Sequence, residues 1–91
     1  MEKLAKVLAE ITDARVMEMF LGEILTRKET KDLALRWQLL IELHDGKTQR
    51  SIARKHGISL CKITRGSKIL KKQDNVTVKL LASTDEEERK R

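Results

Sequence analysis

The chain contains very few of the residues that interrupt helices, with no proline and only four glycines in 91 residues. This scarcity favours long helices and argues against a sandwich or barrel, which needs many turns. Apolar residues recur at helical spacing from the start, at Leu4, Val7, Leu8 and Ile11. We therefore expect an all-α protein that folds as a single domain, residues 1–91.

The chain is short for a core that must support itself. A domain of this size buries only about 60–65% of the surface that its unfolded form exposes. Its one cysteine, Cys61, excludes an internal disulfide. His44, His56 and Cys61 are not spaced as zinc ligands, so no metal site is expected. Oligomerisation is the remaining support for a small domain, and we expect a homodimer.

Capping signals divide the helical pattern. Residues 2–23 are expected to form one or two helices, with a weak point near Thr12-Asp13. A capping box from Thr26 to Glu29 begins the next helix, and Gly46 ends it. The buried stripe expected on this helix is Leu33, Trp37, Leu40 and Ile41. Thr48, Ser59 and Asn75 are placed to cap three further helices, which end before Gly57, near Lys72 and after Leu81.

Positive charge is concentrated in one segment. Lys47–Lys72 holds nine Lys and Arg residues and no Asp or Glu, whereas the rest of the chain holds eleven basic and fourteen acidic residues. The formal net charge of +6 therefore comes from this segment. A basic run is commonly a solvated face, but the complete absence of acids favours a site for a polyanion. Binding to nucleic acid at such a site weakens steeply with salt.

The same segment matches a helix-turn-helix that begins at Gln49. Ile52, at the fourth position, is expected in the core, and Ala53, at the fifth, is small enough for two helices to cross. Gly57, at the ninth, can take the left-handed conformation of the tight turn. The tenth and fifteenth positions, Ile58 and Ile63, are apolar. We interpret residues 48–72 as a DNA-reading head, residues 2–46 and 75–82 as a dimerisation core, and residues 83–91 as a solvated tail.

In this motif the second helix lies in the major groove of double-stranded DNA, with its first residues on base edges. The expected base contacts are Leu60, Cys61, Lys62 and Thr64. Phosphate contacts are expected at the start of the first helix, where exposed amides favour anions, from Thr48, Gln49 and Arg50. Lys71 is expected as a further DNA contact.

Three residues admit a second interpretation. Trp37 could stack on a base, but its place in an apolar stripe favours packing in the core or the dimer interface. His56 occupies the usually apolar eighth position, which favours a half-buried packing histidine over a pH switch. Cys61 could be a redox sensor, although a small residue near DNA is the simpler interpretation.

Gly66 lies inside the second helix of the motif, where glycine costs about 1 kcal/mol relative to alanine. Two explanations are open. Gly66 relieves crowding against another helix, or it lets a flat ligand lie on the backbone while Arg65 stacks on the ligand and pairs with a carboxylate.

The run Ile63-Thr64-Arg65-Gly66-Ser67, preceded by Gln49-Arg50 and Gly57, resembles the tryptophan repressor family. The similarity reaches back through Leu25-Thr26 and Arg36 to Gly46 and covers residues 21–72. The resemblance implies an intertwined homodimer that represses tryptophan biosynthesis genes by binding operator DNA, with L-tryptophan as corepressor. The family is itself a known example of helix-turn-helix docking.

The resemblance also implies a ligand site. The indole ring is expected between Arg36 and Arg65, with Gly66 allowing its close approach. The carboxylate is expected to meet Arg65 and the partner subunit's Thr26, and the ammonium to meet backbone carbonyls of the partner subunit's Glu23 and Leu25. Bound tryptophan would then fix the two reading heads at the separation that DNA requires.

Two departures from the family keep an alternative open. Ile69 replaces a serine near the ligand's ammonium, and the loop before Gln49 is slightly shorter. A ligand-independent helix-turn-helix regulator of the same fold is therefore the second hypothesis. A helical module that docks an acidic protein is a third, although it would not need Gly57 and Ala53.

Other classes of protein are not expected. No Ser/His/Asp, Cys/His or paired-carboxylate constellation indicates an enzyme. No apolar run approaches the roughly 18 residues of a membrane span. The first residues do not resemble a signal peptide, and a lone cysteine suits a reducing compartment. We expect a cytoplasmic protein.

Overall fold

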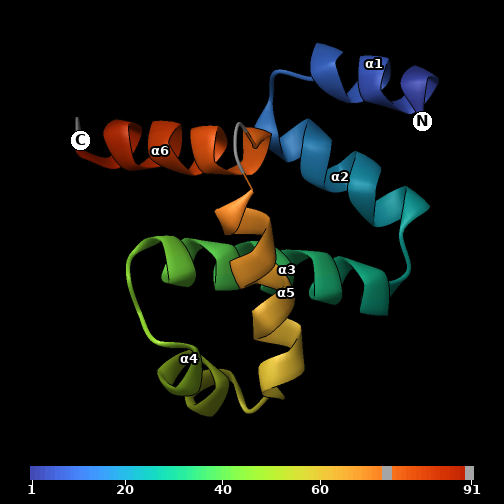
Figure 1. Cartoon of the computed structure of the whole chain (residues 1–91). Coiled ribbons are helices and arrows are strands. Elements are labelled where there is room, and N and C mark those ends of the chain that lie inside the picture. Colours follow the sequence, from blue (N-terminus) through green and yellow to red (C-terminus); the bar gives the residue numbers. More distant parts are fainter. Residues whose placement is uncertain (73–74, 90–91) are drawn as a thin grey trace. The chain divides into compact units, whose positions relative to one another are not determined.

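The computed structural model describes residues 1–72 and 75–89, and these residues form α-helices and no strand (Figure 1). The helices are α1 (Glu2–Glu10), α2 (Ala14–Ile24), α3 (Arg27–His44), α4 (Gln49–His56), α5 (Leu60–Lys71) and α6 (Val76–Arg89). The expected all-α class is confirmed for the described residues. The chain divides into two compact units, Met1–Ala34 and Leu35–Arg91, which are described separately below.

The first unit contains α1, α2 and the start of α3. Helices α1 and α2 are separated at the weak point expected near Thr12-Asp13, because Asp13 caps α2 by accepting a hydrogen bond from the Arg15 amide at 2.9 Å. Neither helix contains a buried residue. This unit therefore leaves several large apolar side chains, among them Val16, Met19 and Ile24, exposed to solvent in a single chain.

The capping box at the start of α3 is confirmed. The Glu29 amide donates to Thr26 Oγ1 at 3.1 Å, and the Thr26 amide donates to Glu29 Oε1 at 2.9 Å. The backbone hydrogen bond from Thr26 and then the bond to its side chain lower the pKa of the Glu29 carboxyl. Both groups therefore satisfy amides that the first turn of a helix leaves without partners.

Gly46 ends α3, as the sequence predicts. Its φ of +89° lies in the region that glycine enters without a Cβ clash. The Gly46 amide donates to the Leu43 carbonyl and the Lys47 amide to the Glu42 carbonyl, each at 3.1 Å. These bonds satisfy carbonyls at the end of the helix and turn the chain toward α4.

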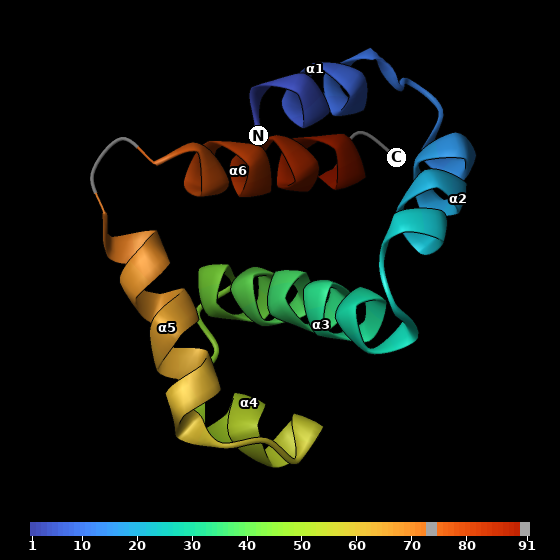
Figure 2. The same ribbon diagram turned by 90° about the vertical axis from the view of Figure 1, so that its right-hand side faces the viewer.

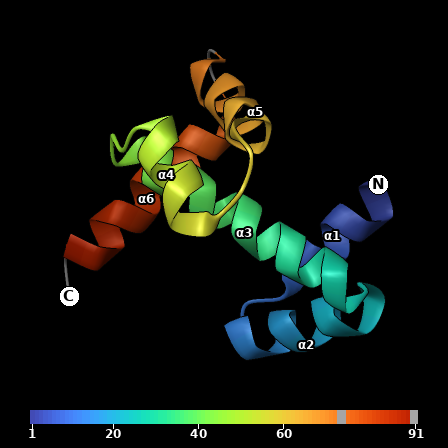
Figure 3. The ribbon, with the colours of Figure 1, turned by 90° about the horizontal axis from the view of Figure 1, so that it is seen from below.

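The second unit has a small apolar core between the end of α3 and the pair α4–α5 (Figure 2). Leu39 from α3, Ile52 from α4 and Ile63 from α5 are buried together. The partly buried residues around them are Leu35, Leu43, Ala53 and Ile58. Seen from below, α4 crosses near the end of α3, consistent with the shared cluster (Figure 3).

The stripe expected on α3 is wrong in part. Leu40 is buried, but the side chains of Leu33 and Trp37 are 48% and 37% exposed, and Ile41 is half-buried. The side of α3 that packs on α4 and α5 is defined by Leu35, Leu39 and Leu43, spaced four residues apart. Both sides of the helix are apolar, so spacing does not reveal which one this chain covers.

The pair α4–α5 has the expected turn. Thr48 caps α4 by accepting from the Ser51 amide at 3.2 Å, and Gly57 ends it in the left-handed conformation, with φ 62° and ψ 39°. Ser59 stands directly before α5 as predicted, but its side chain makes no capping hydrogen bond, which corrects that detail.

Helix α6 follows an asparagine cap. Asn75 Oδ1 accepts from the Val78 amide at 2.7 Å, while its Nδ2 donates to the Lys72 carbonyl at 2.6 Å, so the expected cap also ties the end of α5. The helix is longer than predicted and continues to Arg89. Its last turns are rich in glutamate, which is a good helix former. The end of the expected tail, residues 90–91, lies outside the described residues.

Candidate functional site

The segment 47–72, called the cationic helix pair below, turns its apolar residues inward and its basic residues outward. Ile52 and Ile63 are completely buried, at 0% exposure. All nine Lys and Arg side chains of the segment are classed as exposed. Because the segment has no acid of its own, its solvent-facing surface carries a dense positive charge that favours anions.

The first residues of α4 and α5 lie side by side. Thr64 Oγ1 contacts Gln49 Oε1 at 3.3 Å and donates to the Leu60 carbonyl at 2.9 Å. This contact joins two of the residues predicted to touch DNA. The others near these helix starts are Thr48, whose hydroxyl caps α4, and the exposed Arg50, Leu60, Cys61 and Lys62. Lys71 is exposed at the opposite end of α5, so it is not part of this group.

The residues expected to hold a ligand are divided between the two units. Arg36 on α3 and Arg65 on α5 are exposed and belong to the second unit. Glu23, Leu25 and Thr26 belong to the first unit. Beside them, a shallow hollow of about 530 Å³ is lined by Gly22, Leu25, Arg27, Thr30 and Lys31.

Gly66 is buried where α5 packs on α3. A Cβ at this position would lie 3.2 Å from Leu43 Cδ1 and 3.4 Å from Leu40 Cδ2. Relief of crowding against another helix, one of the two explanations offered for this glycine, is therefore what the structure displays. The ligand role of Gly66 stays a prediction.

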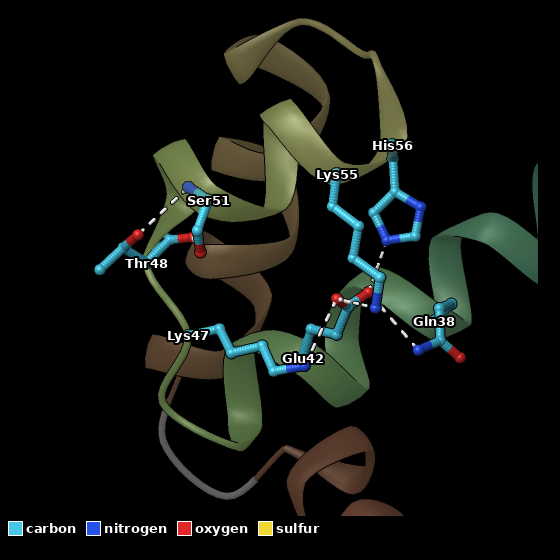
Figure 4. A network of polar contacts seen from close by, with 7 residues as sticks. All are labelled: Gln38, Glu42, Lys47, Thr48, Ser51, Lys55 and His56. Carbon is cyan, nitrogen blue, oxygen red and sulfur yellow. Dashed lines mark hydrogen bonds and ion pairs between the residues drawn. The ribbon is translucent and has the colours of Figure 1, made fainter.

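Glu42 is the one buried charged residue among those that the structure describes, and sequence reasoning missed it (Figure 4). Its Oε1 accepts from Lys55 Nζ at 3.0 Å and lies 3.8 Å from Lys47 Nζ. Its Oε2 lies 2.6 Å from His56 Nε2 and 3.4 Å from Gln38 Nε2. We call Gln38, Glu42, Lys47, Lys55 and His56 the Glu42 cluster.

The cluster keeps the Glu42 carboxylate ionised. Burial raises the pKa of this carboxyl, but hydrogen bonds from His56, Lys55 and Gln38, with the charge of His56, outweigh burial and lower the pKa to about 2. His56 is half-buried, as expected, but it is an ion-pair partner rather than a packing residue.

A sequence signal for this cluster existed. Glu42 interrupts the apolar run of Leu39, Leu40, Ile41 and Leu43, and His56 interrupts the apolar pattern of the helix pair. An acid and a base that are each out of place can satisfy one another, because buried charges are normally paired. Only His56 is considered in the sequence analysis, and a histidine at that position without a known partner indicates a packing residue.

The described residues form neither a membrane span nor a metal site. No helix there has both the length and the apolar character that crossing a bilayer requires. The same residues contain no group of three or more His, Cys, Asp or Glu placed to hold a metal ion.

Fold and charge together define a small all-helical protein with an exposed, acid-free cationic helix pair. The family model described as Trp repressor protein matches residues 1–85. The chain belongs to the Trp repressor protein family, which confirms the resemblance seen in the sequence.

Curated relatives agree with this assignment. A Trp operon repressor homolog of Xylella fastidiosa (strain M23) is 41% identical over 75 residues, covering 81% of this chain and 79% of the relative. A Trp operon repressor homolog of Chlamydia trachomatis serovar D is 44% identical over 62 residues, covering 63% and 66%. The homolog from serovar L2 is 49% identical over 47 residues, or 50% of each chain. No solved structure is significantly similar to the chain.

Proposed function

We propose that this protein is a DNA-binding transcriptional repressor, not an enzyme, and that it controls tryptophan biosynthesis genes in the cytoplasm. The proposal is supported by membership of the Trp repressor protein family and by relatives named Trp operon repressor homologs. The observation that carries it is the cationic helix pair, with two buried isoleucines inside and nine exposed cations outside.

The helix pair α4–α5 is the proposed helix-turn-helix. Gly57 supplies the left-handed turn, and Ile52 and Ile63 supply the apolar contact between the helices. In such a motif the first residues of α5 enter the major groove, and the start of α4 lies over phosphates. Lys62 is long enough to reach guanine O6 or N7, and Gln49 is placed to orient Thr64 through their contact at 3.3 Å.

The proposed repressor is a homodimer whose core includes the first unit. This is supported by the absence of buried residues in α1 and α2. Met19, Ile24 and Val16 are 67%, 51% and 49% exposed in a single chain. Apolar faces of this extent in a small soluble chain are normally covered, and a second copy that shares the same face provides such a cover.

L-tryptophan is the proposed corepressor. Arg36 and Arg65 provide two exposed guanidinium groups within the second unit, suited to an indole face and a carboxylate. The partner subunit's Thr26, Glu23 and Leu25 complete the proposed site. Tryptophan would bind the DNA-competent arrangement of the heads more tightly and so increase its population.

A ligand-independent regulator of the same fold is the second candidate. Gly66 already has a packing reason, since a Cβ would press on Leu43 at 3.2 Å. Ile69 is half-buried and cannot donate or accept a hydrogen bond through its side chain. Both observations remove part of the argument for a bound amino acid.

One DNA-binding experiment distinguishes the tryptophan-dependent repressor from the ligand-independent regulator. Footprinting on a duplex selected by the protein from a random library should give a protected site that strengthens when L-tryptophan is added. Equal protection with and without tryptophan favours the second candidate, and no protected site contradicts DNA recognition altogether. Each cation that contacts a phosphate should contribute about −0.9 to the slope of log affinity against log salt.

A pair of variants on α5 tests the corepressor site. Arg65→Ala should abolish the response to tryptophan. Lys68→Ala removes the same charge from an exposed position of the same helix and should keep the response. If both variants respond like the wild type, Arg65 does not bind the corepressor.

A further inference from the structure

Glu42 has a position that the proposed function does not explain. A buried ion pair usually adds little stability over apolar residues of the same size, because two charges lose their hydration. Glu42 is nevertheless 2% exposed at its side chain, on the last full turn of α3, in contact with cations from two neighbouring segments. The contacts of Glu42 show which parts of the molecule it holds in place.

The contacts of Glu42 reach both ends of α4. Lys47 directly precedes Thr48, the residue that caps α4, and its amide donates to the Glu42 carbonyl at 3.1 Å. His56 is the last residue of α4, and its ring nitrogen lies 2.6 Å from the Glu42 carboxylate. The carboxylate of one α3 residue thus contacts Lys47, just before the start of α4, and His56, at its end (Figure 4). The backbone bond from the Lys47 amide to the Glu42 carbonyl holds the same segment.

The apolar core holds α4 mainly near its middle. Ile52 is the fully buried residue of this eight-residue helix, Ala53 packs beside it, and Ile58 packs on the core just after the helix. A helix held near its middle can tilt about that point, whereas polar contacts at both ends oppose the tilt. The Glu42 cluster provides such contacts before the start of α4, at Lys47, and at its last residue, His56.

The restraint extends to α5. His56 is followed by Gly57, and the turn leads through Ser59 to Leu60, the first residue of α5. The start of α4 is also joined to α5 by the contact between Gln49 and Thr64, which lies one turn into α5 and bonds back to the Leu60 carbonyl. A change in the tilt of α4 would consequently move the first turn of α5.

We propose that Glu42 is a positioning residue for DNA recognition: it ties both ends of α4 to α3 and so fixes the first turn of α5 in the orientation that reads base edges. The inference rests on the proposed function. Sites that must read chemical groups tolerate little displacement, because hydrogen bonds to bases depend on distance and direction. Glu42 itself faces α4 and is too buried to contact DNA.

If Glu42 acted only through its charge, its substitution would have a different effect on DNA binding. Glu42→Gln removes a negative charge and releases Lys47 and Lys55, whose side chains are 51% and 56% exposed. A purely electrostatic role therefore predicts tighter binding to every duplex, with the preference among sequences unchanged. A positioning role predicts a loss of preference.

The experiment measures the ratio of affinities for two duplexes, using the full chain with saturating L-tryptophan. One duplex is selected by the wild type from a random library, and the other is a shuffled sequence of the same length and composition. Glu42→Gln should lower the ratio about three- to thirty-fold, while affinity for the shuffled duplex stays equal or rises.

Glu10→Gln is the matched control, because it makes the same charge change at an exposed position on α1. Its affinity ratio should equal that of the wild type. Circular dichroism at the assay temperature must show full helicity for both variants.

A second set of variants keeps the inference testable if Glu42→Gln fails to fold. Lys55→Gln and His56→Gln each remove one partner, of which Lys55 is more than half exposed. Each should lower the ratio by less than Glu42→Gln. The double variant should lose less than the product of the two effects, because both act through one carboxylate.

The outcomes separate this inference from the proposed function. If folded Glu42→Gln, or the double variant in its place, keeps the wild-type ratio, Glu42 has no positioning role although DNA recognition stands. If the wild type itself selects no duplex, the proposed function is wrong, and the inference falls with it.

Discussion

The two units of this chain differ in how many side chains they bury within a single chain. In the second unit, three buried side chains from three helices form an apolar cluster, and a buried carboxylate adds a polar attachment beside it. In the first unit, neither α1 nor α2 buries a residue. The second unit thus has contacts that can define its fold within one chain, whereas the first lacks them. The difference supports the proposed homodimer, in which a second copy would cover the first unit.

The largest effect is expected from the core of the second unit. Ile63→Ala should lower the free energy of unfolding by about 2–5 kcal/mol, because Ile63 is fully buried in a cluster too small to collapse around the gap. Ile63→Val should lose only about 0.5–1.5 kcal/mol. Urea unfolding at fixed protein concentration measures both. Equal, small effects would show that the cluster does not hold this unit together.

Acid should lower the stability of the second unit, because it protonates the Glu42 carboxylate. Its folded pKa, about 2, lies below its ordinary value of 4.5, so its stabilisation is present above 4.5 and is lost as the pH falls through about 2. The stabilisation is on the order of 3 kcal/mol.

Thermal unfolding of the wild type and Glu42→Gln from about pH 6 to pH 2 isolates this contribution. The difference in stability should stay constant down to about pH 4.5 and then shrink as the pH falls toward 2. A difference that does not change with pH would mean that the carboxylate is not held ionised by its neighbours.

A substitution in the first unit should change the affinity of one chain for another. Met19→Lys places a charge on an apolar side chain that is 67% exposed in one chain. If a second copy covers that face, the substitution should weaken dimerisation by about 2 kcal/mol, or roughly thirtyfold. Glu18→Lys, at the neighbouring exposed position, is the control. Matching dissociation constants for the two variants would place Met19 outside the interface.

Two glycines give the smallest effects and opposite signs. Gly57 has a φ of +62°, so Gly57→Ala should lower stability by about 1–2 kcal/mol. Gly22 lies within α2 with no atom within 4 Å of its added Cβ, so Gly22→Ala should raise stability by about 0.5–1 kcal/mol. Thermal unfolding checks both, and a destabilising Gly22→Ala would show that the partner packs closely on that position.

The sequence predicted local structure better than contacts between helices. The capping box at Thr26, the caps at Thr48 and Asn75 and the turn at Gly57 depend on residues that are close together in the chain. The chemistry of these residues determines the local conformation with little contribution from contacts between helices. The helix boundaries followed from these signals, except that α6 continues beyond its expected end.

The errors concern which side of a helix is covered. On α3, the apolar residues surround much of the helix, and spacing favoured the side of Trp37 over that of Leu39. Which side a single chain covers depends on where α4 and α5 pack, and that is not a local property. Glu42 was missed for the same reason, since its partners Lys55 and His56 lie thirteen and fourteen residues away.

The predicted DNA and ligand contacts stay predictions. The structure brings Gln49 and Thr64 together and exposes the cations of the helix pair, which is compatible with a DNA-binding surface. Arg36, Arg65 and the residues around Thr26 remain predictions for a ligand, because the proposed site includes residues of a second subunit. Gly66 has a packing role against Leu43 and Leu40, and its ligand role remains a prediction.

Sedimentation equilibrium of the full chain, over a range of micromolar concentrations, tests the contrast between the units most directly. A homodimer that covers the first unit predicts a species of twice the chain mass, whose dissociation on dilution is accompanied by loss of helical circular-dichroism signal from α1 and α2. A species of single-chain mass that keeps its full helical signal would contradict it, because the first unit would then be stable without a partner.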